Sequence, residues 1–427
     1  MPLLTRRALL SQLAFTASAA VEKPEADTHT LVCVFLRGGA DTMNIWVPYA
    51  DDAYYRQRPT VSIKRPGSGS DAAIKLTDHY ALHPAMQPLE GAFKEGRFGA
   101  VQAVGLDNNT GSHFECQDQM EHGISMHADE DDDQKKAEKK KDDESETKRP
   151  TGGGWLGRFL RARGGKKQSP LSAIAIGTAL PESLRGAPSV SVLEHINDIA
   201  IKAPSGDPAA IVAALRSLYG ADVTMLGERG TETLDLFKRV SALQGKDYTP
   251  EHGADYAKTD FASGLSEIAR LIKARVGLEV ACIDLGGWDT HFFQGTANGT
   301  QAERIKTLAD GIAAFDADMK SHRSSYTIMI TTEFGRRIYE NASLGTDHGR
   351  GFAFMALGDK VKGGRILGPW PTEAVDESNP LGPGGLAMHT DFRDIFAEVL
   401  RSTHGLSNEE ATKVFPGASR TPVGLLI

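Results

Sequence analysis

Short apolar runs of strand length recur along the chain, separated by longer segments of helical pattern. The runs are rich in Val and Ile and lie at residues 31–36, 98–104, 173–176, 278–283, 326–331 and 352–357. Their apolar positions are continuous and do not alternate with polar ones, which is typical of strands buried on both faces. These runs therefore predict the strands of a central, mostly parallel sheet.

Helical patterns fill the segments between these runs. The clearest has spacings of 3, 4, 3 and 4 and places one apolar stripe at Ile305, Leu308, Ile312, Phe315 and Met319. Two further patterns, around residues 211–218 and 234–243, predict helices added to one side of the sheet. The alternation predicts an α/β fold, doubly wound, in a single domain spanning residues 28–405, with helices on both faces of the sheet. Ligands bind such folds at the carboxyl ends of the strands.

Residues 127–150 depart from this alternation. They include ten acidic and seven basic residues, and Ala137 is their largest apolar side chain. Such a segment buries too little apolar surface to offset the entropy of ordering, so we predict a disordered charged insertion. The alternatives are an exposed charged helix and an acidic run that binds divalent cations.

The first residues have the layout of an export signal. Arg6 and Arg7 precede an apolar run that reaches Phe15, and the small residues 17–19 follow. Residues 1–20 therefore predict a twin-arginine-like signal, with the twin-arginine export machinery as partner and a periplasmic or extracellular destination. An amphipathic first helix is the alternative, and the usual Lys after the apolar pair is absent. No later segment approaches about 18 uninterrupted apolar residues, so we expect no stable membrane insertion.

The composition is that of an ordinary globular protein. The 427 residues include 48 Lys and Arg against 56 Asp and Glu, a net charge of −8, and 40% are hydrophobic. This acidic balance, without a basic stripe, argues against a nucleic-acid partner, because phosphate backbones are held mainly by Lys and Arg. The three cysteines, Cys33, Cys116 and Cys282, are too far apart for a zinc knuckle or a disulfide framework.

Polar side chains gather directly after the predicted strands. Four of these strands are followed by such residues. Asp41 comes after residues 31–36, Ser112 and His113 after 98–104, Asp289 and His291 after 278–283, and Glu333 and Arg336 after 326–331, with Asp347 and His348 soon after. Each alone has a simpler interpretation as a cap, a turn residue or a surface ion pair. Because the strand ends of such a sheet lie together, their clustering favours a metal-assisted site.

The residue types indicate the chemistry. Asp289 and His291 are two positions apart in an extended loop, which suits zinc or manganese. Ser112 near a helix N-terminus is either a cap or a nucleophile, and His113 either carries protons or is structural. Arg336 or Arg350 offers a guanidinium that could clamp an oxyanion.

The spaced motifs carry a family resemblance. They are Leu36-Arg-Gly-Gly-Ala-Asp41, Ser112-His-Phe114, Gly286-Gly-Trp-Asp-Thr-His291, Thr332-Glu-Phe-Gly-Arg336 and Gly345-Thr-Asp-His-Gly349. With them the chain resembles the exported bacterial domain-of-unknown-function 1501 family, which is related to the alkaline phosphatase and sulfatase superfamily. The resemblance implies an alkaline-phosphatase-like α/β sandwich, with divalent metals at the strand ends around a nucleophile that attacks a phosphate or sulfate ester.

The resemblance also assigns roles to these residues. It implies metal ligation by Asp41, Asp289, His291, Glu333 and His348, with Asp347 either binding the metal or lying behind a ligand, and it places Ser112 near the nucleophile. The residues themselves add His113 and Arg336 as predicted catalytic groups. The superfamily usually has Asp followed by His where this chain has Glu333 followed by Phe334, and its Asp-to-His spacing is longer than that of Asp289 and His291. A single-metal or remodelled site is therefore expected as well as a two-metal one. Zinc, manganese, calcium and magnesium all stay open.

Two functions follow from this sequence. The first is an exported, metal-dependent hydrolase of a phosphate or sulfate ester, with a small molecule or a glycan as substrate. The alternative is an exported binding protein of the same fold, catalytically inactive, that recognises an anionic glycan or a similar ligand.

Overall fold

The computed structural model describes residues 28–105, 111–124, 152–163, 169–199, 207–245, 248–370, 385–419 and 421–427. The predicted export signal at residues 1–20 and the predicted charged insertion at 127–150 lie outside these residues.

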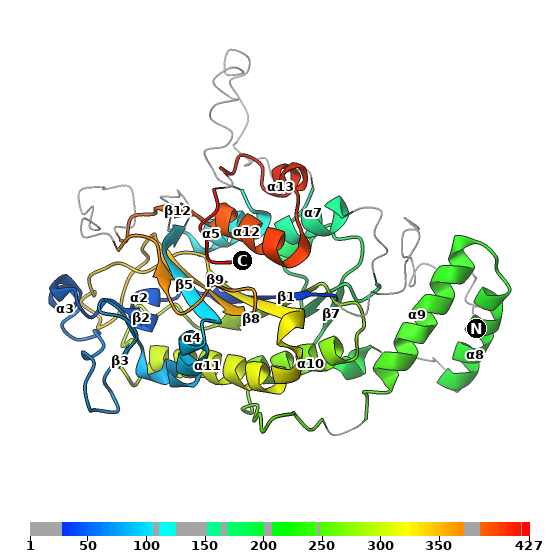
Figure 1. Ribbon diagram of the computed structural model, residues 1–427, viewed down its shortest axis with the longest axis horizontal. Helices are drawn as coiled ribbons and strands as arrows, with labels where there is room; N and C mark the ends of the chain where they lie inside the picture. Colours follow the sequence, from blue (N-terminus) through cyan, green and yellow to red (C-terminus); the bar gives the residue numbers. More distant parts are fainter. Residues whose placement is uncertain are drawn as a thin grey trace, which may run out of the picture.

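The core of the fold is a nine-stranded sheet with the order β11-β5-β10-β9-β1-β8-β6-β7, in which β12 pairs with β5 (Figure 1). Its strands are β1 Thr30–Arg37, β5 Phe98–Gly105, β6 Ala173–Ile176, β7 Ser191–Leu193, β8 Val280–Gly286, β9 Tyr326–Thr332, β10 Phe352–Gly358, β11 Ile366–Leu367 and β12 Thr390–Asp391. Strand β10 is antiparallel to β5 and β9, and the other pairs are parallel. The predicted mostly parallel sheet is confirmed.

Every apolar run predicted to be a strand forms one. The structure adds strands of two or three residues, which are too short to give a pattern: β7, β11, β12 and a separate small sheet of β2 Trp46–Val47, β4 Ala81–Leu82 and β3 Ile74–Lys75. Strand β8 begins two residues later than its apolar run. The sequence pattern therefore predicted the central strands better than the edges.

Helices cover both faces of the sheet, as expected (Figure 1). On β1, Val32 and Val34 belong to the core beneath one helical layer, while Leu31 belongs to the core of the opposite layer. The first layer consists of α4 Gln87–Lys94, α10 Asp260–Lys273 and α11 Thr300–Asp318. The second consists of α5 His113–His122, α7 Trp155–Ala162, α12 Phe392–His404 and α13 Asn408–Val414.

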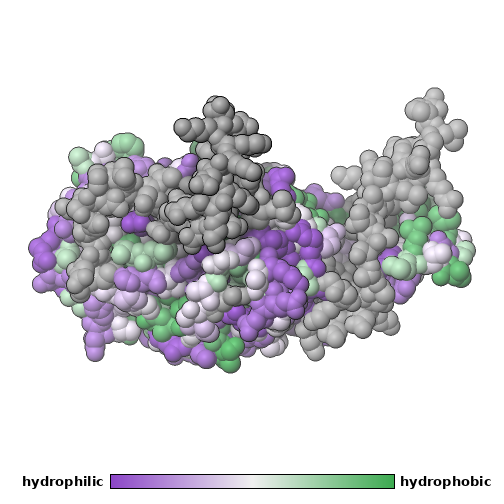
Figure 2. Space-filling model, turned by 90° about the horizontal axis from the view of Figure 1, so that it is seen from above, coloured by the Kyte–Doolittle hydropathy of each residue, from purple (hydrophilic) through white to green (hydrophobic). Residues whose placement is uncertain are grey.

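Two further helices, α8 Pro208–Gly220 and α9 Met225–Ser241, pack on each other and form an arm at one end of the molecule (Figure 1). The two helices of the arm correspond to the patterns around residues 211–218 and 234–243, which predicted helices added to one side of the sheet. Helix α8 buries none of its residues, and apolar surface is visible at this end in Figure 2. The arm's exposed apolar side chains are Leu218, Val223, Met225 and Leu226.

Two short α-helices, α2 Thr42–Ile45 and α3 Asp52–Gln57, follow β1, and the described residues also form the short 3-10 helices η1 Pro84–Met86, η3 Glu182–Leu184, η4 Ile196–Asp198 and η5 Lys320–Ser325. Among the described residues, no helix is both long enough and apolar enough to cross a bilayer.

Candidate metal centre

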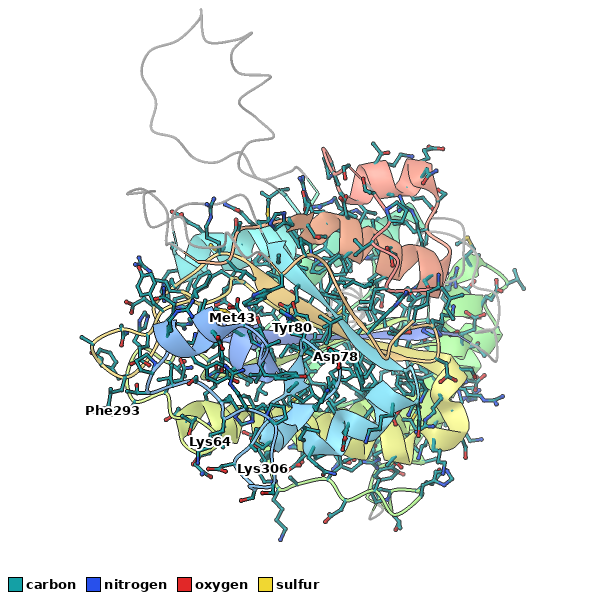
Figure 3. All side chains as sticks on the ribbon, turned by 60° about the vertical axis from the view of Figure 1, so that its left-hand side comes forward. Met43, Lys64, Asp78, Tyr80, Phe293 and Lys306 are labelled. Atoms are coloured by element: carbon teal, nitrogen blue, oxygen red, sulfur yellow. The ribbon has the colours of Figure 1, made fainter. Side chains whose placement is uncertain are left out.

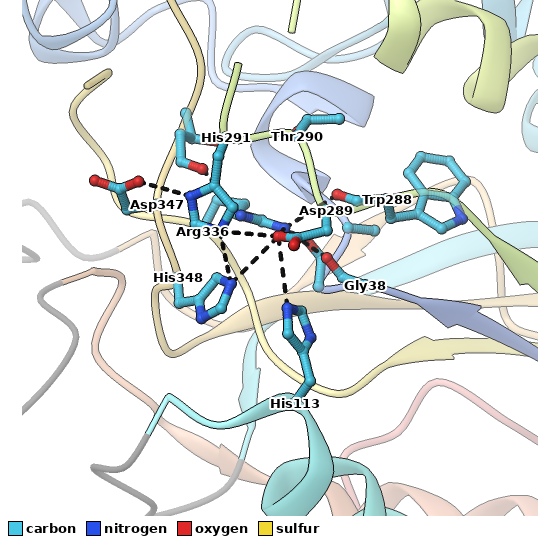
Figure 4. Close-up of polar contacts among 12 residues, drawn as sticks. Gly38, His113, Trp288, Asp289, Thr290, His291, Arg336, Asp347 and His348 are labelled. Atoms are coloured by element: carbon cyan, nitrogen blue, oxygen red, sulfur yellow. Dashed lines mark hydrogen bonds and ion pairs between the residues drawn. The ribbon is translucent and has the colours of Figure 1, made fainter. Parts of the chain in front are cut away.

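The strands that carry the predicted site end at the same level. Leu36 of β1 lies opposite Thr332 of β9, and Arg37 lies opposite Gly286 of β8. The loops that follow these three strands therefore meet at one edge of the sheet. Helix α5, which starts at His113, brings its N-terminus to the same place (Figure 4).

Three side chains converge there. His113, Asp289 and His348 place one potential ligand atom each within 4.8 Å of one another. The Oδ1 atom of Asp289 lies 3.2 Å from Nε2 of His348 and 3.5 Å from Nε2 of His113. His291 joins them, with its Nε2 atom 3.0 Å from the same oxygen. The structure thus brings together four of the predicted site residues.

Asp289 is held as an anion. Burial alone would raise the pKa of this carboxyl, but the Arg336 guanidinium, which donates a hydrogen bond of 2.6 Å, lowers its pKa to about 2. An ionised carboxylate at the centre of several imidazoles attracts a cation.

Each of the three histidines uses Nδ1 for a hydrogen bond to oxygen. His113 donates to Glu333 Oε1 at 2.9 Å, and His291 donates to Asp347 Oδ1 at 2.7 Å. His348 donates to the carbonyl oxygen of Gly111 at 2.7 Å. Because these oxygens accept, the proton is assigned to Nδ1 and each Nε2 lone pair is left facing the centre. This is the arrangement in which metal-ligating histidines are held.

The donor atoms fit a transition-metal ion. The Nε2 atoms of His291 and His348 are 2.9 Å apart, so their lone pairs repel unless a proton or a cation lies between them. Tetrahedral ligands at about 2.1 Å from zinc are roughly 3.4 Å from one another, close to the 3.0–3.5 Å between Asp289 and the imidazoles. Within the described residues, the buried Nε2 atom of His113 has no hydrogen-bond partner. Imidazole nitrogen with carboxylate oxygen is the donor set that zinc prefers.

Glu333 was predicted as a metal ligand, and Asp347 either as a ligand or as a residue behind one; the structure places both behind histidines. Glu333 is fully buried and also accepts hydrogen bonds from the Gly38 amide and from Gln117. Burial would raise its pKa, but the bonds from His113 and Gln117 lower it on balance, and Glu333 in turn raises the pKa of His113. In this arrangement the two carboxylates orient His113 and His291.

Arg336 is buried and bound by the protein's own acceptors. Its guanidinium donates to the carbonyl oxygens of Gly38 at 2.5 Å, Gly39 at 2.6 Å and Thr346 at 2.9 Å, as well as to Asp289. It therefore joins the loops after β1, β8 and β9. This surrounding differs from the oxyanion clamp that the sequence predicted for Arg336, and it gives the side chain a positioning role.

Asp41 lies in a different polar network. Its carboxylate is fully buried, accepts from Arg58 Nη1 at 2.6 Å and accepts from Gln294 Nε2 at 2.7 Å. The structure therefore gives Asp41 an arginine as its counter-ion where the sequence predicted a metal.

Ser112 is the N-cap of α5, where its Oγ atom accepts a hydrogen bond from the Glu115 amide at 3.5 Å. This bond is at the long end of hydrogen-bond distances. The hydroxyl lies at the positive end of the helix and next to His113, a position that suits either of its predicted roles.

Phe334 occupies the space beside two of the imidazoles. Its ring centroid lies 4.9 Å from that of His113 and 4.7 Å from that of His348. A Cβ atom added to Gly39 would come within 2.3 Å of this ring, so the glycine in the β1 motif allows the ring's approach. The ring therefore forms an apolar wall beside His113 and His348.

Two polar residues that sequence reasoning missed support the centre. Asn341 donates to Asp347 Oδ1 at 2.8 Å and to the His291 carbonyl oxygen at 3.0 Å. Gln117 donates to Glu333 and lies four residues after His113 on α5, on the same helix face. That spacing could have indicated Gln117, whereas no local pattern indicates Asn341.

Comparison with known proteins finds one matching family and several solved structures of low sequence identity. The family model described as "Protein of unknown function (DUF1501)" matches residues 28–420. No curated protein matches the chain.

Several solved structures are similar at low identity. The C-terminal periplasmic domain of EcEptC from Escherichia coli, in complex with Zn, is similar at 9% identity, covering 79% of this chain and 75% of that one, with a TM-score of 0.34. Alkaline phosphatase from the Antarctic bacterium TAB5 is similar at 7% identity, covering 79% and 94%, with a TM-score of 0.27. A 2-O GAG sulfatase is similar at 10% identity, covering 78% and 65%, with a TM-score of 0.27.

Proposed function

The chain belongs to the DUF1501 family, and from that premise we propose that it is an exported, metal-dependent hydrolase of a phosphate or sulfate ester. The observation that carries the proposal is the convergence of three imidazole Nε2 atoms on one ionised carboxylate oxygen of Asp289. In this proposal His113, Asp289, His291 and His348 hold the ion.

A bound divalent ion would polarise the ester and stabilise the negative charge that develops on it. The chain's own residues prepare this site. Glu333 and Asp347 hold His113 and His291 in the required tautomer, and Arg336 fixes the Asp289 carboxylate. Ser112 is the candidate nucleophile, because the N-terminus of α5 favours negative charge on its oxygen.

We propose one ion and not two. Phe334 packs against His113 and His348 where the superfamily has a further histidine ligand, and Asp41 is neutralised by Arg58. The first observation removes a ligand from a second metal position. The second gives Oδ2 of Asp41 another partner, although the buried Oδ1 atom has no hydrogen-bond partner among the described residues.

An exported binding protein is the second candidate function. It is favoured by the same Phe334 and by Arg336, whose donors are occupied by Gly38, Gly39, Thr346 and Asp289. An enzyme that transfers a charged group needs a cation to stabilise the charge of that group. Because its donors are occupied, Arg336 does not supply this cation, which favours the binding protein.

Export is part of the proposal and is supported by the Arg6-Arg7 pattern. Replacing both arginines with lysine should keep the charge and block a twin-arginine pathway. We expect this variant to remain in the cytoplasmic fraction of the bacterium, whereas unchanged fractionation would contradict this part of the proposal.

The function is tested by metal content, followed by turnover. The chain from Ala20 onward, purified without chelator or a nickel column, should hold about one equivalent of a transition metal by plasma mass spectrometry. Asp289→Ala and His291→Ala should abolish binding, and Asp235→Ala, on the exposed face of α9, is the matched control. Unchanged metal content in both site variants would overturn the site. Metal without turnover of nitrophenyl phosphate or sulfate would favour the binding protein.

A further inference from the structure

Exposed apolar side chains border the candidate metal centre. Phe114 is 87% exposed and directly follows His113, and Phe292 is 69% exposed and directly follows His291. Phe293 is 72% exposed, and Leu344 is 42% exposed in the loop that leads to Asp347. We call these four side chains the apolar rim. A single exposed apolar residue is ordinary, but a group of them beside one polar site points to a binding surface.

Backbone hydrogen bonds join the loop that carries Phe292 and Phe293 to the loop that carries Leu344. The Phe293 amide donates to the Ser343 carbonyl oxygen at 3.0 Å, and the Gln294 amide donates to the Leu344 carbonyl oxygen at 2.9 Å. The backbones also meet at Gly345, where an added Cβ atom would lie 2.4 Å from the carbonyl carbon of His291. Phe292, Phe293 and Leu344 are therefore fixed relative to His291.

The backbone under the rim is strained. Phe293 has φ = 45° and Leu344 has φ = 58°, a left-handed conformation that bulky side chains rarely adopt. Neither side chain is buried by this conformation, and Figure 3 shows Phe293 at the outer edge of the molecule. Packing of the core therefore does not explain why these positions are Phe and Leu. Strain of this kind gathers at ligand-binding sites.

We propose that the apolar rim binds the apolar part of the substrate, so that the substrate is an amphiphilic ester. Its phosphate or sulfate head faces His113, Asp289, His291 and His348, and its alkyl or aryl group covers the rim. This inference rests on the proposed function, which supplies the head-group site. Removing apolar surface from water on both partners provides the affinity.

A lipid bilayer is a different occupant for the same surface. The net charge of −8 gives no general attraction to an anionic membrane, whose surface potential is negative. Phe114 and Phe292 directly follow His113 and His291 in the chain, which favours a molecule that also contacts the centre.

The test is calorimetric titration of the zinc-loaded chain with methylphosphonate and with octylphosphonate below its micelle concentration. Both carry the same head and a carbon–phosphorus bond that this hydrolysis does not cleave. We expect octylphosphonate to bind about thirtyfold more tightly, the effect of burying two or three methylene groups. Phe292→Ser with Phe293→Ser should reduce this ratio to about threefold or less, with methylphosphonate affinity and zinc content unchanged. Leu218→Ser, on the exposed arm, is the matched control and should keep the full ratio.

The other possible results separate a failure of the rim from a failure of the proposed function. Methylphosphonate binding that Asp289→Asn abolishes, with octylphosphonate no tighter, overturns the rim but leaves the proposed function standing. Failure of both phosphonates to bind overturns both. A preference for octylphosphonate that survives in the double serine variant also overturns the rim. Vesicles of phosphatidylcholine should not bind, and rim-dependent vesicle binding with equal phosphonate affinities would make the rim a membrane contact and overturn the proposal.

Discussion

Glu333 accepts a hydrogen bond from Nδ1 of His113 at 2.9 Å, although the two residues are 220 positions apart in the chain. The carboxylate comes from the end of β9 and the imidazole from the start of α5, so this bond ties a helix of one layer to the sheet. It also turns Nε2 of His113 toward Asp289. Orientation of the ligand is therefore a property of the tertiary fold and not of either motif alone.

Replacing Glu333 with Gln tests this orientation. The variant keeps an oxygen for the Gly38 amide but loses the negative charge behind His113. We expect zinc affinity to fall about tenfold to hundredfold, as for other partners of ligating histidines. In the metal-free chain, NMR titration should show a lower pKa for His113, because the carboxylate is the main cause that raises it. An unchanged His113 titration would contradict the role we assign to Glu333.

Asp41→Asn separates the two interpretations of the first-strand carboxylate. The buried Arg58 guanidinium would lose its counter-ion, which destabilises proteins by about 3–5 kcal/mol. We expect that loss in urea unfolding, with metal stoichiometry unchanged. Asp235→Asn, in an exposed pair with Arg216, is the control and should change stability by less than about 1 kcal/mol. Loss of the metal in a folded Asp41→Asn chain would restore Asp41 as a ligand.

The contrast between Asp41 and Asp289 shows how far sequence reasoning reaches. Both follow apolar strand runs, so both were placed at the correct edge of the sheet. Their partners differ because Arg58 enters from a segment beyond α3 that has no apolar period, whereas the partner histidines follow strands or begin a helix. Continuous apolar runs predict strands and strand ends. They do not predict which side chain packs behind another, as Glu333 does behind His113.

Arg336→Lys tests whether this guanidinium holds the centre together. Lysine cannot reproduce the fork that reaches the carbonyl oxygens of Gly38, Gly39 and Thr346, so buried acceptors would lose their donors. We expect about 3 kcal/mol or more of lost stability and weaker metal binding through Asp289. Arg216→Lys, at the exposed pair on the arm, is the control. A stable variant with normal metal affinity would show that Arg336 is dispensable for positioning.

His83 should make the protein less stable in mild acid. Mainly through burial, its pKa is lowered from 6.5 to about 4. Its Nδ1 atom accepts from the Ala85 amide, while its Nε2 atom donates to the Thr296 carbonyl oxygen, so only the neutral form fits. Below pH 6.5 the unfolded chain takes up a proton that the folded chain refuses until about pH 4, so stability falls across this window.

The size of this effect can be measured by urea unfolding at pH 7.5 and pH 5.0. This histidine should contribute about 2 kcal/mol to the difference in unfolding free energy between the two pH values. In His83→Gln the difference should shrink by that amount, whereas His252→Gln, at an exposed position, should leave it unchanged. An equal pH dependence in both variants would contradict the prediction.

Ser112→Ala decides whether the hydroxyl at the start of α5 is a nucleophile or only a cap. If Ser112 attacks the ester, the variant should lose at least about a thousandfold in kcat while keeping its metal, because the ligands are untouched. Its capping bond of 3.5 Å is weak, so the stability cost should stay near or below about 1 kcal/mol.

The matched control is Ser407→Ala, which removes the cap of α13 far along the chain. The Ser407 Oγ atom accepts a shorter hydrogen bond of 3.2 Å from the Glu410 amide, and the Ser407 amide donates to the Glu410 carboxylate in return. Losing this cap should cost at least as much stability without affecting kcat. Equal small losses of turnover in the two variants would mean that Ser112 only caps its helix. The nucleophile would then have to be water, and the histidines with Asp289 would carry the reaction without a covalent step.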